Sequence, residues 1–419
     1  MDLAAVQRLA DRDPAALLPP RLARAARLAT PVAMVDLLDA GGDAAIAIGH
    51  TGDEIVVVPV AGEPPRRAVA GDGVAAGALR VIGDGAPRGR FRPVVFGPVP
   101  TPGPERAIAV DQSNESTVVN DAAVVKLFPR TAAGPQPGLV IPAHLAAVGF
   151  TEIATAFGAL LWDDVLIATA TAYLPGARDG WDWFVEALLS ALDGAGAWPV
   201  ADAEALGGLV ARFHVAMATP SSVFPEPVAS APSDRWHETA LVTLGNALAE
   251  TDGAEGARLR ALEPRISAAL GGLALPGETP VIHIHGDLHV GQVLRWDGGP
   301  DALSDFDGNP IAPVTERVAP GPAARDVASM ARAIDHVGRI CQRRRAGRDA
   351  DVRAWITDAR DAFLHAYRAL APIELFDERL LLPLEVAQEC HEFVYAARYL
   401  PRWRYVPDLA MPNLLETIG

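Results

Sequence analysis

The sequence predicts an α+β protein built from three successive parts. Residues 1–100 contain short apolar runs separated by glycine-containing turns, which is typical of β-strands. A proline-rich joint (GPVPTPGPE, residues 97–105) follows, and beyond residue 200 apolar residues recur with helical spacing. We therefore expect a β-rich cap over residues 1–100, a small α/β lobe over 101–175 and a large, mostly helical lobe over 176–419.

Five short strands account for the β-rich cap. Each is an apolar run bounded by GG, GD or PRG turns. The expected strands are Val32–Leu37, Ala44–Ile48, Ile55–Val60, Leu79–Ile82 and Pro93–Phe96.

The small lobe begins with a hairpin. Thr117–Val119 and Ala123–Phe128 flank Asn120-Asp121, a pair that favours the tight turn between two antiparallel strands. A short helix is expected at Pro142–Val148, and an apolar, β-branched strand at Val165–Tyr173.

Helices make up most of the remainder. The apolar stripe from Leu206 to Met217 predicts a helix that ends before Pro220. Further helices are expected at Arg258–Leu270 (with a break at Pro264), Ala323–Arg345, Val352–Leu370 and Pro383–Leu400.

The composition excludes several classes of protein. Of the 419 residues 50% are hydrophobic and 21% charged, so the chain is globular rather than disordered. A formal net charge of −16 argues against binding to nucleic acid or an anionic membrane, which needs clustered cations. No apolar run is long enough to span a bilayer, the N-terminus lacks a signal pattern, and two cysteines cannot form a disulfide framework. We expect a cytoplasmic protein that is a monomer or a weak homodimer.

Lysine usage singles out one residue. The 36 basic residues are 35 arginines and a single lysine, Lys126, within the expected strand of the hairpin. Since arginine serves for nearly every other cation in this chain, a lone lysine indicates a position that needs a compact point charge.

The densest polar cluster lies in residues 281–310. Its side chains alternate along a strand-like run and continue past two glycines: His283, His285, Asp287, Gln292 and Asp305. Phosphoryl transfer uses such a set, with one carboxylate for the attacking hydroxyl and an amide and a second carboxylate for Mg²⁺. The alternation of His283, His285 and His289 with Asp287 would also suit a zinc-dependent hydrolase.

Two motifs in this cluster resemble the aminoglycoside-phosphotransferase-like kinases, which share the protein-kinase fold. They are HGDLHVGQ (285–292) and DFDG (305–308). The stretches DQSNESTVV (111–119), LPGARDGW (174–181) and RDVASM (325–330) are similar to actinobacterial maltokinases, as is the β-rich cap. The resemblance implies a protein-kinase-like bilobal fold that uses ATP and Mg²⁺, with Asp287 as catalytic base and with Gln292 and Asp305 as metal ligands.

The resemblance also implies a nucleotide site in the small lobe. Lys126 would contact the phosphates. Ser113, Asn114 and Ser116 would supply donors to the phosphates. The backbone at Thr171 and Tyr173 would receive adenine. Kinases pair the phosphate-contacting lysine with a glutamate of the following helix. Residues 138–144 (GLVIPAH) carry no carboxylate, and Glu152 comes only later.

The C-terminal segment bears on the phosphate acceptor. HEFVYAARYLPRWRYVP (391–407) is similar to the maltokinase tail, but His391 replaces a tyrosine, and its LPRW form looks more like the related glucosamine kinases. Trp403 offers a flat apolar face to a sugar, and Glu392 can pair with hydroxyls or with an ammonium group. The acceptor residues expected are Asp287, His289, Glu392 and Trp403.

Several functions remain open at this point. We expect an ATP-dependent kinase that phosphorylates the 6-hydroxyl of glucosamine. A maltokinase that forms maltose 1-phosphate is the alternative, followed by an aminoglycoside phosphotransferase. A metal-dependent hydrolase or a kinase-like binding module without turnover are two further classes, the last supported only by the missing helix glutamate.

Overall fold

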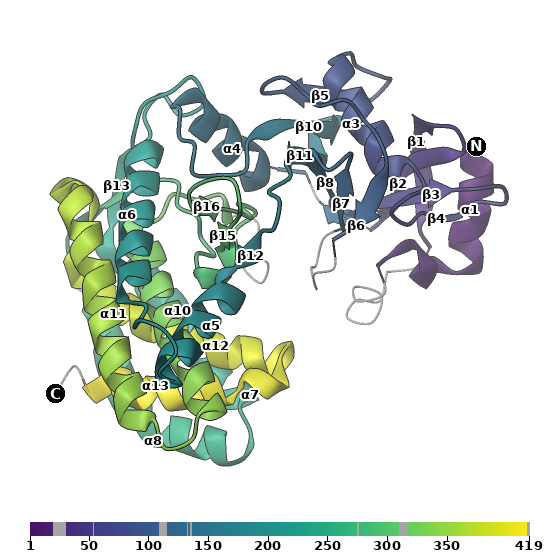
Figure 1. Ribbon diagram of the computed structural model, residues 1–419. Helices are drawn as coiled ribbons and strands as arrows, with labels where there is room; N and C mark the ends of the chain where they lie inside the picture. Colours follow the sequence, from purple (N-terminus) through teal and green to yellow (C-terminus); the bar gives the residue numbers. More distant parts are fainter. Residues whose placement is uncertain are drawn as a thin grey trace. The chain divides into compact units, whose positions relative to one another are not determined.

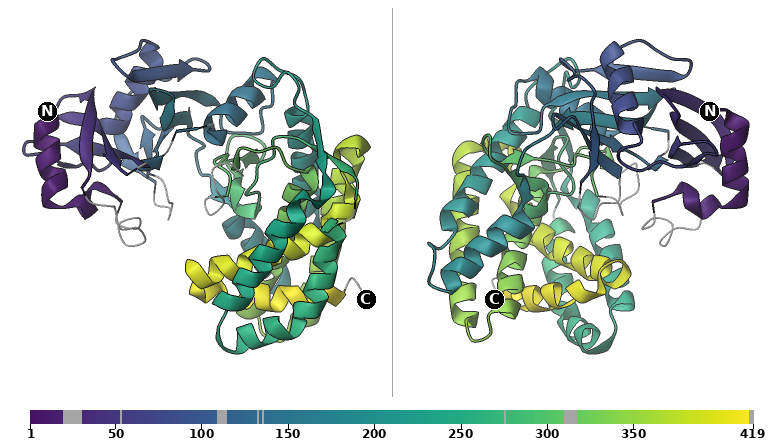
Figure 2. Two further views of the ribbon diagram at one scale, coloured as in Figure 1. Left: turned by 180° about the vertical axis from the view of Figure 1, so that it is seen from behind. Right: turned by 45° about the vertical axis from the view of Figure 1, so that its right-hand side comes forward.

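The computed structural model describes residues 1–19, 31–52, 54–108, 115–131, 133–134, 136–274, 276–309 and 317–416. The chain folds as two compact units, of which the first is rich in strands and the second in helices (Figures 1 and 2). The first unit comprises residues 1–146 and 154–175, and the second comprises residues 147–153 and 176–419. The proline-rich joint at residues 97–105 lies inside the first unit.

Two antiparallel sheets form the first unit. One contains β1 (Ala33–Gly41), β2 (Ala44–Thr51), β3 (Glu54–Ala61) and β4 (Arg66–Arg67), with β9 (Arg130–Thr131) also paired to β3. The other runs in the order β5 (Phe91–Val95), β10 (Ala156–Trp162), β11 (Val165–Ala172), β8 (Ala123–Leu127), β7 (Glu115–Val119) and β6 (Glu105–Ala107). Both sheets thus mix strands from the expected cap and the expected small lobe.

Helix α3 (Val74–Asp84) lies between the two sheets. Alternate residues of β2 point to opposite faces, so Ile46 and Ile48 pack toward α3, whereas Ala45 and Ala47 pack toward α1 (Leu3–Arg12). The approach is close, because a Cβ at Gly77 would lie 2.3 Å from the carbonyl oxygen of Ala40 on β1. Only glycine fits there.

The prediction of a strand at Leu79–Ile82 was wrong, since these residues belong to α3. A short apolar run does not by itself distinguish a buried strand from a buried helix. Residues 74–79 are all buried, because α3 packs against a sheet on each side and has almost no polar face. The other four expected strands and the hairpin are confirmed.

The second unit consists mainly of helices. They are α5 (Gly180–Leu192), α6 (Val200–Met217), α7 (His237–Glu250), α8 (Gly253–Leu270), α10 (Ala323–Arg344), α11 (Asp349–Leu370), α12 (Leu381–Arg398) and α13 (Tyr405–Glu416). Two small sheets, β12 (Arg178–Asp179) with β15 (Val293–Arg295) and β16 (Ala302–Leu303), and β13 (Ala229–Pro232) with β14 (Glu278–Val281), lie between them in sequence. The helices expected in this part of the chain are confirmed.

Pro264 does not break its helix, contrary to expectation. It lies inside α8 and on the exposed side. Proline removes one backbone hydrogen bond, and on an exposed side water can bind the carbonyl that is left free.

The other described helices are short. The first unit also contains α4 (Pro137–Ala147). One-turn helices occur at Pro14–Leu17, Ser233–Trp236, Gly271–Ala274, Val290–Gln292, Ile373–Leu375, Glu378–Leu380 and Pro401–Trp403.

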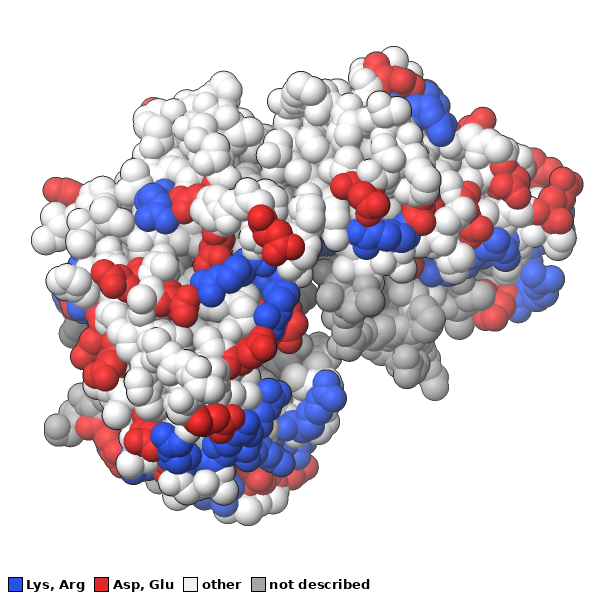
Figure 3. All heavy atoms as spheres, in the orientation of Figure 1, with Lys and Arg blue, Asp and Glu red and all other residues white. Residues whose placement is uncertain are grey.

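Charged side chains are intermixed on the molecular surface. On the face shown in Figure 3, acidic groups accompany the basic ones. In the described part of the chain, arginines form ion pairs such as Arg66–Asp72, Arg90–Asp163 and Arg258–Asp408. Among the described helices, none is long and apolar enough to cross a membrane.

Candidate active site

Lys126 lies on β8 in the second sheet of the first unit. The strand register pairs it with Ser116 on β7 and with Thr169 on β11. Directly paired residues point to the same face of a sheet, and Thr171 shares that face because it is two residues from Thr169. A row of half-buried polar side chains therefore crosses three strands, while residues of the opposite face such as Val125 are buried toward α3.

The hairpin that carries Lys126 has the expected turn. Asn120 and Asp121 adopt left-handed φ values of 53° and 46°, as this type of two-residue turn requires. The backbone N–H of Tyr173 donates to the carbonyl of Ala122 at 3.0 Å, which ties the end of β11 to the same hairpin. Ser113 and Asn114 lie outside the described residues, so their predicted role stays a prediction.

Helix α4 covers part of the face that carries Lys126. Leu139 on α4 packs with Phe128 and Leu166 of the sheet. The helix has the sequence PGLVIPAHLAA and supplies no carboxylate, and Glu152 makes a two-fold ion pair with Arg212 at 2.6 and 2.7 Å. The glutamate that kinases place beside this lysine is thus absent from α4.

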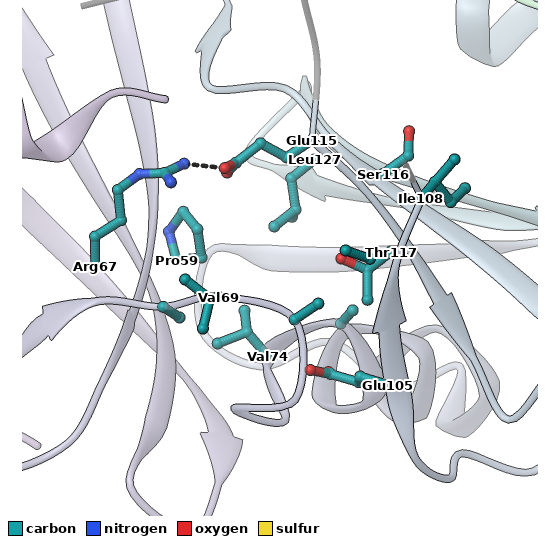
Figure 4. Close-up of a pocket in the computed structure, with 14 residues that line it drawn as sticks. Pro59, Arg67, Val69, Val74, Glu105, Ile108, Glu115, Ser116, Thr117 and Leu127 are labelled. Carbon is teal, nitrogen blue, oxygen red and sulfur yellow. Dashed lines mark ion pairs between the residues drawn. The ribbon is translucent and has the colours of Figure 1, made fainter. Parts of the chain in front are cut away.

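A pocket of about 250 Å³ lies between the two sheets of the first unit (Figure 4). An ion pair between Arg67 on β4 and Glu115 on β7 lies at its side. Its lining includes Ser116 but none of the other predicted site residues. Ligand pockets for small molecules usually exceed about 300 Å³, so this pocket is small for a nucleotide.

Asp287 lies in the second unit, in the loop that follows β14. It is half-buried, and burial raises the pKa of its carboxyl above the ordinary value. The negative charge of Asp305 acts in the same direction, while the imidazoles of His289, His285 and His391 oppose it. Such a concentration of titratable groups around one carboxyl is typical of a functional site.

A hairpin brings the two predicted metal ligands together. Gln292 precedes β15, Asp305 follows β16, and Val293 pairs with Leu303. Ser304 donates to the carbonyl of Gln292 from both its backbone N–H, at 2.9 Å, and its hydroxyl, at 3.2 Å.

Asp305 has the geometry of an exposed ligand. Its side chain is exposed, and its backbone has a left-handed φ of 61°, which is uncommon outside glycine. Carboxylate and amide oxygens suit Mg²⁺, which usually takes one or two protein groups together with water and phosphate oxygens. The carboxylate of Asp305 and the amide of Gln292 therefore fit a magnesium ion.

The histidines near Asp287 have other partners. The ring of His283 stacks on Phe224 at 4.2 Å. His285 bonds the carbonyl of Ser304 through Nε2 at 2.9 Å, and Nδ1 of His289 accepts from the Gly291 N–H at 3.0 Å. Across the described part of the chain, no three His, Cys, Asp or Glu side chains form a group that could hold a metal. The zinc-hydrolase alternative therefore finds no support in this geometry.

Asp326, in the first turn of α10, holds the backbone of the loop that carries Asp287, and it was not among the predicted site residues. Its carboxylate accepts from the backbone N–H groups of His285 and Gly286 at 2.8 and 3.0 Å. It also contacts Nε2 of His214 at 3.2 Å, and Nδ1 of His214 bonds the hydroxyl of Tyr367 at 2.8 Å. Burial alone would raise the pKa of Asp326, but the hydrogen bonds and charges of these groups lower it on balance.

Replacing Asp326 by asparagine should lower the free energy of unfolding by about 3 kcal/mol at neutral pH. An amide can accept one of the two backbone N–H groups but presents a donor to the other. Because the pKa of Asp326 is lowered in the folded state, its stabilising effect is full above the unfolded-state pKa and is lost as the pH falls through the folded-state pKa.

Urea unfolding of both proteins over an acidic pH series measures this difference. The gap between Asp326→Asn and the wild type should shrink toward low pH. Asp193→Asn, which breaks an exposed ion pair with Arg345, is the matched control and should change stability little. Equal stability of Asp326→Asn and the wild type at neutral pH would contradict the prediction.

The structure brings Glu392 and Trp403 together. Glu392 lies on α12 and Trp403 in the one-turn helix Pro401–Trp403. The indole Nε1 of Trp403 donates to Glu392 Oε2 at 3.2 Å, and the amide of Gln388 donates to Oε1 at 3.1 Å. Both side chains are partly exposed, so a ligand can reach them.

Two contacts connect this pair of residues with the loops that carry Asp287 and Asp305. The ring of Trp181, at the start of α5, lies 5.5 Å from that of Trp403 and 5.8 Å from that of His289. A Cβ at Gly291 would lie 2.5 Å from Trp181 Nε1, so glycine makes room for the indole. The link is therefore built from aromatic rings.

The second contact joins the loop after Asp305 to α12. The amide of Asn309, just after DFDG, lies 3.1 Å from Nε2 of His391, the neighbour of Glu392. Trp181, Asn309 and His391 were not predicted as site residues. Trp181 belongs to the motif LPGARDGW (174–181), and His391 begins the C-terminal segment 391–407. Membership of these motifs was the sequence feature that could have identified them as site residues.

Comparisons with known proteins give close relatives. No protein-family model matches the chain. A glucosamine kinase of Streptacidiphilus jiangxiensis is 40% identical over an alignment of 432 residues that covers 97% of each chain. A glucosamine kinase of Mycolicibacterium smegmatis is 37% identical over 402 residues, which cover 91% of this chain and 98% of the relative.

Solved structures agree. One crystal form of a glucosamine kinase matches with a TM-score of 0.83 at 38% identity and covers 97% of this chain and 98% of its own. Another, in complex with glucosamine, ADP and inorganic phosphate, matches with a TM-score of 0.78 at 39% identity, over 97% and 98% of the two chains. The predicted α+β fold class is confirmed.

Proposed function

The chain belongs to the glucosamine kinase family, and from this we propose that it transfers the γ-phosphoryl group of ATP to the 6-hydroxyl of glucosamine. A solved relative binds glucosamine and ADP. The single observation in this chain that supports an aminosugar acceptor is the environment of Glu392.

Glu392 is the last of three glutamates along one side of α12. Glu385 pairs with Arg360 at 2.7 Å, and Glu389 pairs with His336 at 3.0 Å. Within the described residues Glu392 has no salt bridge, and its hydrogen-bond partners are the neutral groups of Gln388 and Trp403. A partly exposed carboxylate whose hydrogen-bond partners are neutral is suited to the ammonium group of glucosamine.

The proposed mechanism assigns one task to each residue. Asp287 orients the acceptor hydroxyl and accepts its proton as the sugar oxygen attacks the γ-phosphorus and ADP leaves. Gln292 and Asp305 would hold Mg²⁺, which neutralises charge on the phosphate oxygens when bound. Trp403 stacks on the sugar ring. Lys126, with Ser116 near it in the sheet, steadies the nucleotide phosphates, and the end of β11 at Thr171 and Tyr173 receives adenine.

The test is ATP consumption with Mg²⁺ across a panel of acceptors. Glucosamine should be turned over, and glucose, N-acetylglucosamine, maltose and an aminoglycoside much more slowly. Preferred turnover of maltose would support the maltokinase alternative. Binding of ATP without turnover on any sugar would overturn the proposal in favour of an inactive binding module.

Replacing Lys126 by arginine should lower kcat/KM for ATP about tenfold or more, because a planar guanidinium does not reproduce a compact ammonium charge. The matched control is Arg130→Lys, the opposite exchange at a partly exposed residue that pairs with Glu54. It should leave kcat/KM unchanged. Steady-state kinetics at saturating glucosamine measure both, and full activity of the Lys126→Arg enzyme would refute a phosphate role for the lysine.

A further inference from the structure

Trp403 contacts a buried residue outside the predicted site. His336 on α10 is 3% exposed, and its Nε2 lies 3.0 and 3.2 Å from the two carboxylate oxygens of Glu389 on α12, which is fully buried. The pair joins α10 to α12, the helix that also carries Glu392.

The imidazole of His336 also contacts Trp403. The two ring centres are 6.1 Å apart at an interplanar angle of 87°, the perpendicular arrangement that aromatic rings favour. Trp403 belongs to a one-turn helix, in which its backbone N–H donates to the carbonyl of Leu400 at 2.8 Å. The orientation of the indole depends on its ring contacts, with Trp181 and Tyr405 as the other partners, and on the hydrogen bond from its Nε1 to Glu392.

The orientation of the indole in turn affects Glu392. Among the described residues, the Nε1–H of Trp403 is one of two donors to this carboxylate, and each donor binds a different oxygen. A rotated indole would release Oε2 and leave the carboxylate free to turn. The contacts thus run from Glu389 through His336 and Trp403 to Glu392.

We infer that the buried His336–Glu389 pair is a positioning element of the acceptor site, which holds Trp403 and through it the carboxylate that receives the amine. The inference rests on the proposed function. His336 itself touches neither substrate, so its effect should appear in the KM for glucosamine rather than in the KM for ATP.

A second buried pair between the same two helices can show whether His336 and Glu389 have only a structural role. One helical turn away, Arg332 on α10 pairs with Glu385 on α12, and these two side chains are as buried as His336 and Glu389. This second pair links the same two helices, but among the described contacts neither of its members touches Trp403. A general loosening of the helix pair would affect the acceptor site from either position.

The experiment compares two double variants that differ only in the ring. In His336→Leu/Glu389→Leu both polar partners are removed, so no buried charge is left unpaired. In His336→Phe/Glu389→Leu an aromatic ring is restored against Trp403. The first should raise the KM for glucosamine about five- to tenfold with little change in the KM for ATP, and the second should recover most of that loss.

Three outcomes overturn the inference. They are an unchanged KM for glucosamine in the leucine variant, no recovery with phenylalanine, and an equal rise in KM in the control Glu385→Gln. Thermal melting reports whether each variant folds. If the leucine variant does not fold, His336→Gln/Glu389→Gln takes its place, because it keeps a hydrogen bond between neutral groups but lacks the ring. If the wild type does not phosphorylate glucosamine, the proposed function fails instead, so the two failures are distinguishable.

Discussion

Asp287→Asn should reduce kcat by about 10³-fold, while the KM values for ATP and glucosamine change far less. The side-chain amide keeps the shape of the carboxyl but cannot accept the proton of the attacking hydroxyl. Steady-state kinetics at saturating substrates measure the loss. Asp301→Asn is the control, because this carboxylate lies in the same β15–β16 hairpin but binds Arg295 at 3.0 Å, and it should retain activity.

The pH dependence gives a second readout of the same residue. Only the ionised carboxylate can accept a proton, so activity should fall as the pH drops through the pKa of Asp287. Burial raises that pKa, so the fall should begin above the pH expected for an ordinary aspartate, whose pKa is about 3.9. A loss of less than tenfold in Asp287→Asn, or a residual activity with the same acid limb, would remove Asp287 from the role of base.

Glu392→Gln should raise the KM for glucosamine about 100-fold, since a charge-assisted hydrogen bond to the ammonium is replaced by a neutral one. Turnover of glucose, which has a hydroxyl in place of the amine, should change much less. The ratio of kcat/KM for the two sugars therefore isolates the charge from the rest of the sugar contacts.

A surface glutamate provides the control for this substitution. Glu378 forms an exposed ion pair with Arg368, and Glu378→Gln should leave both sugars unaffected. If Glu392→Gln lowers the turnover of glucose and glucosamine equally, the carboxylate serves a hydroxyl or the fold rather than the amine.

Local patterns in the sequence predicted most elements correctly. The apolar run Ala44–Ile48 reflects a strand that is buried on both sides, and Asn120-Asp121 marked the hairpin because its backbone needs positive φ. The wrong prediction of a strand at Leu79–Ile82 and the correct one at Ala44–Ile48 have the same physical origin, burial on both sides. An element enclosed between two sheets loses the polar face by which a helix is distinguished from a strand.

The active-site motif could be predicted because its residues are close in sequence, and the rest could not because they meet only in space. Gln292 and Asp305 are joined by one hairpin. Asp326 reaches the backbone of His285 from 41 residues away, and His336 meets Glu389 across 53 residues. A carboxylate or imidazole on an amphipathic helix looks the same in the sequence whether it points to solvent or to a partner on another helix.

The position of α3 has a consequence for how the first unit can be divided. One side of this helix completes the core of the sheet that carries Lys126, and another side completes the core of the N-terminal sheet. Deleting or inserting one residue in α3 would rotate the following side chains by about 100° and misalign both cores together. The N-terminal hundred residues are therefore no removable appendage: a truncated enzyme that began after them would lose α3 and β5, and the sheet that carries Lys126 would expose to water the apolar face that α3 now buries.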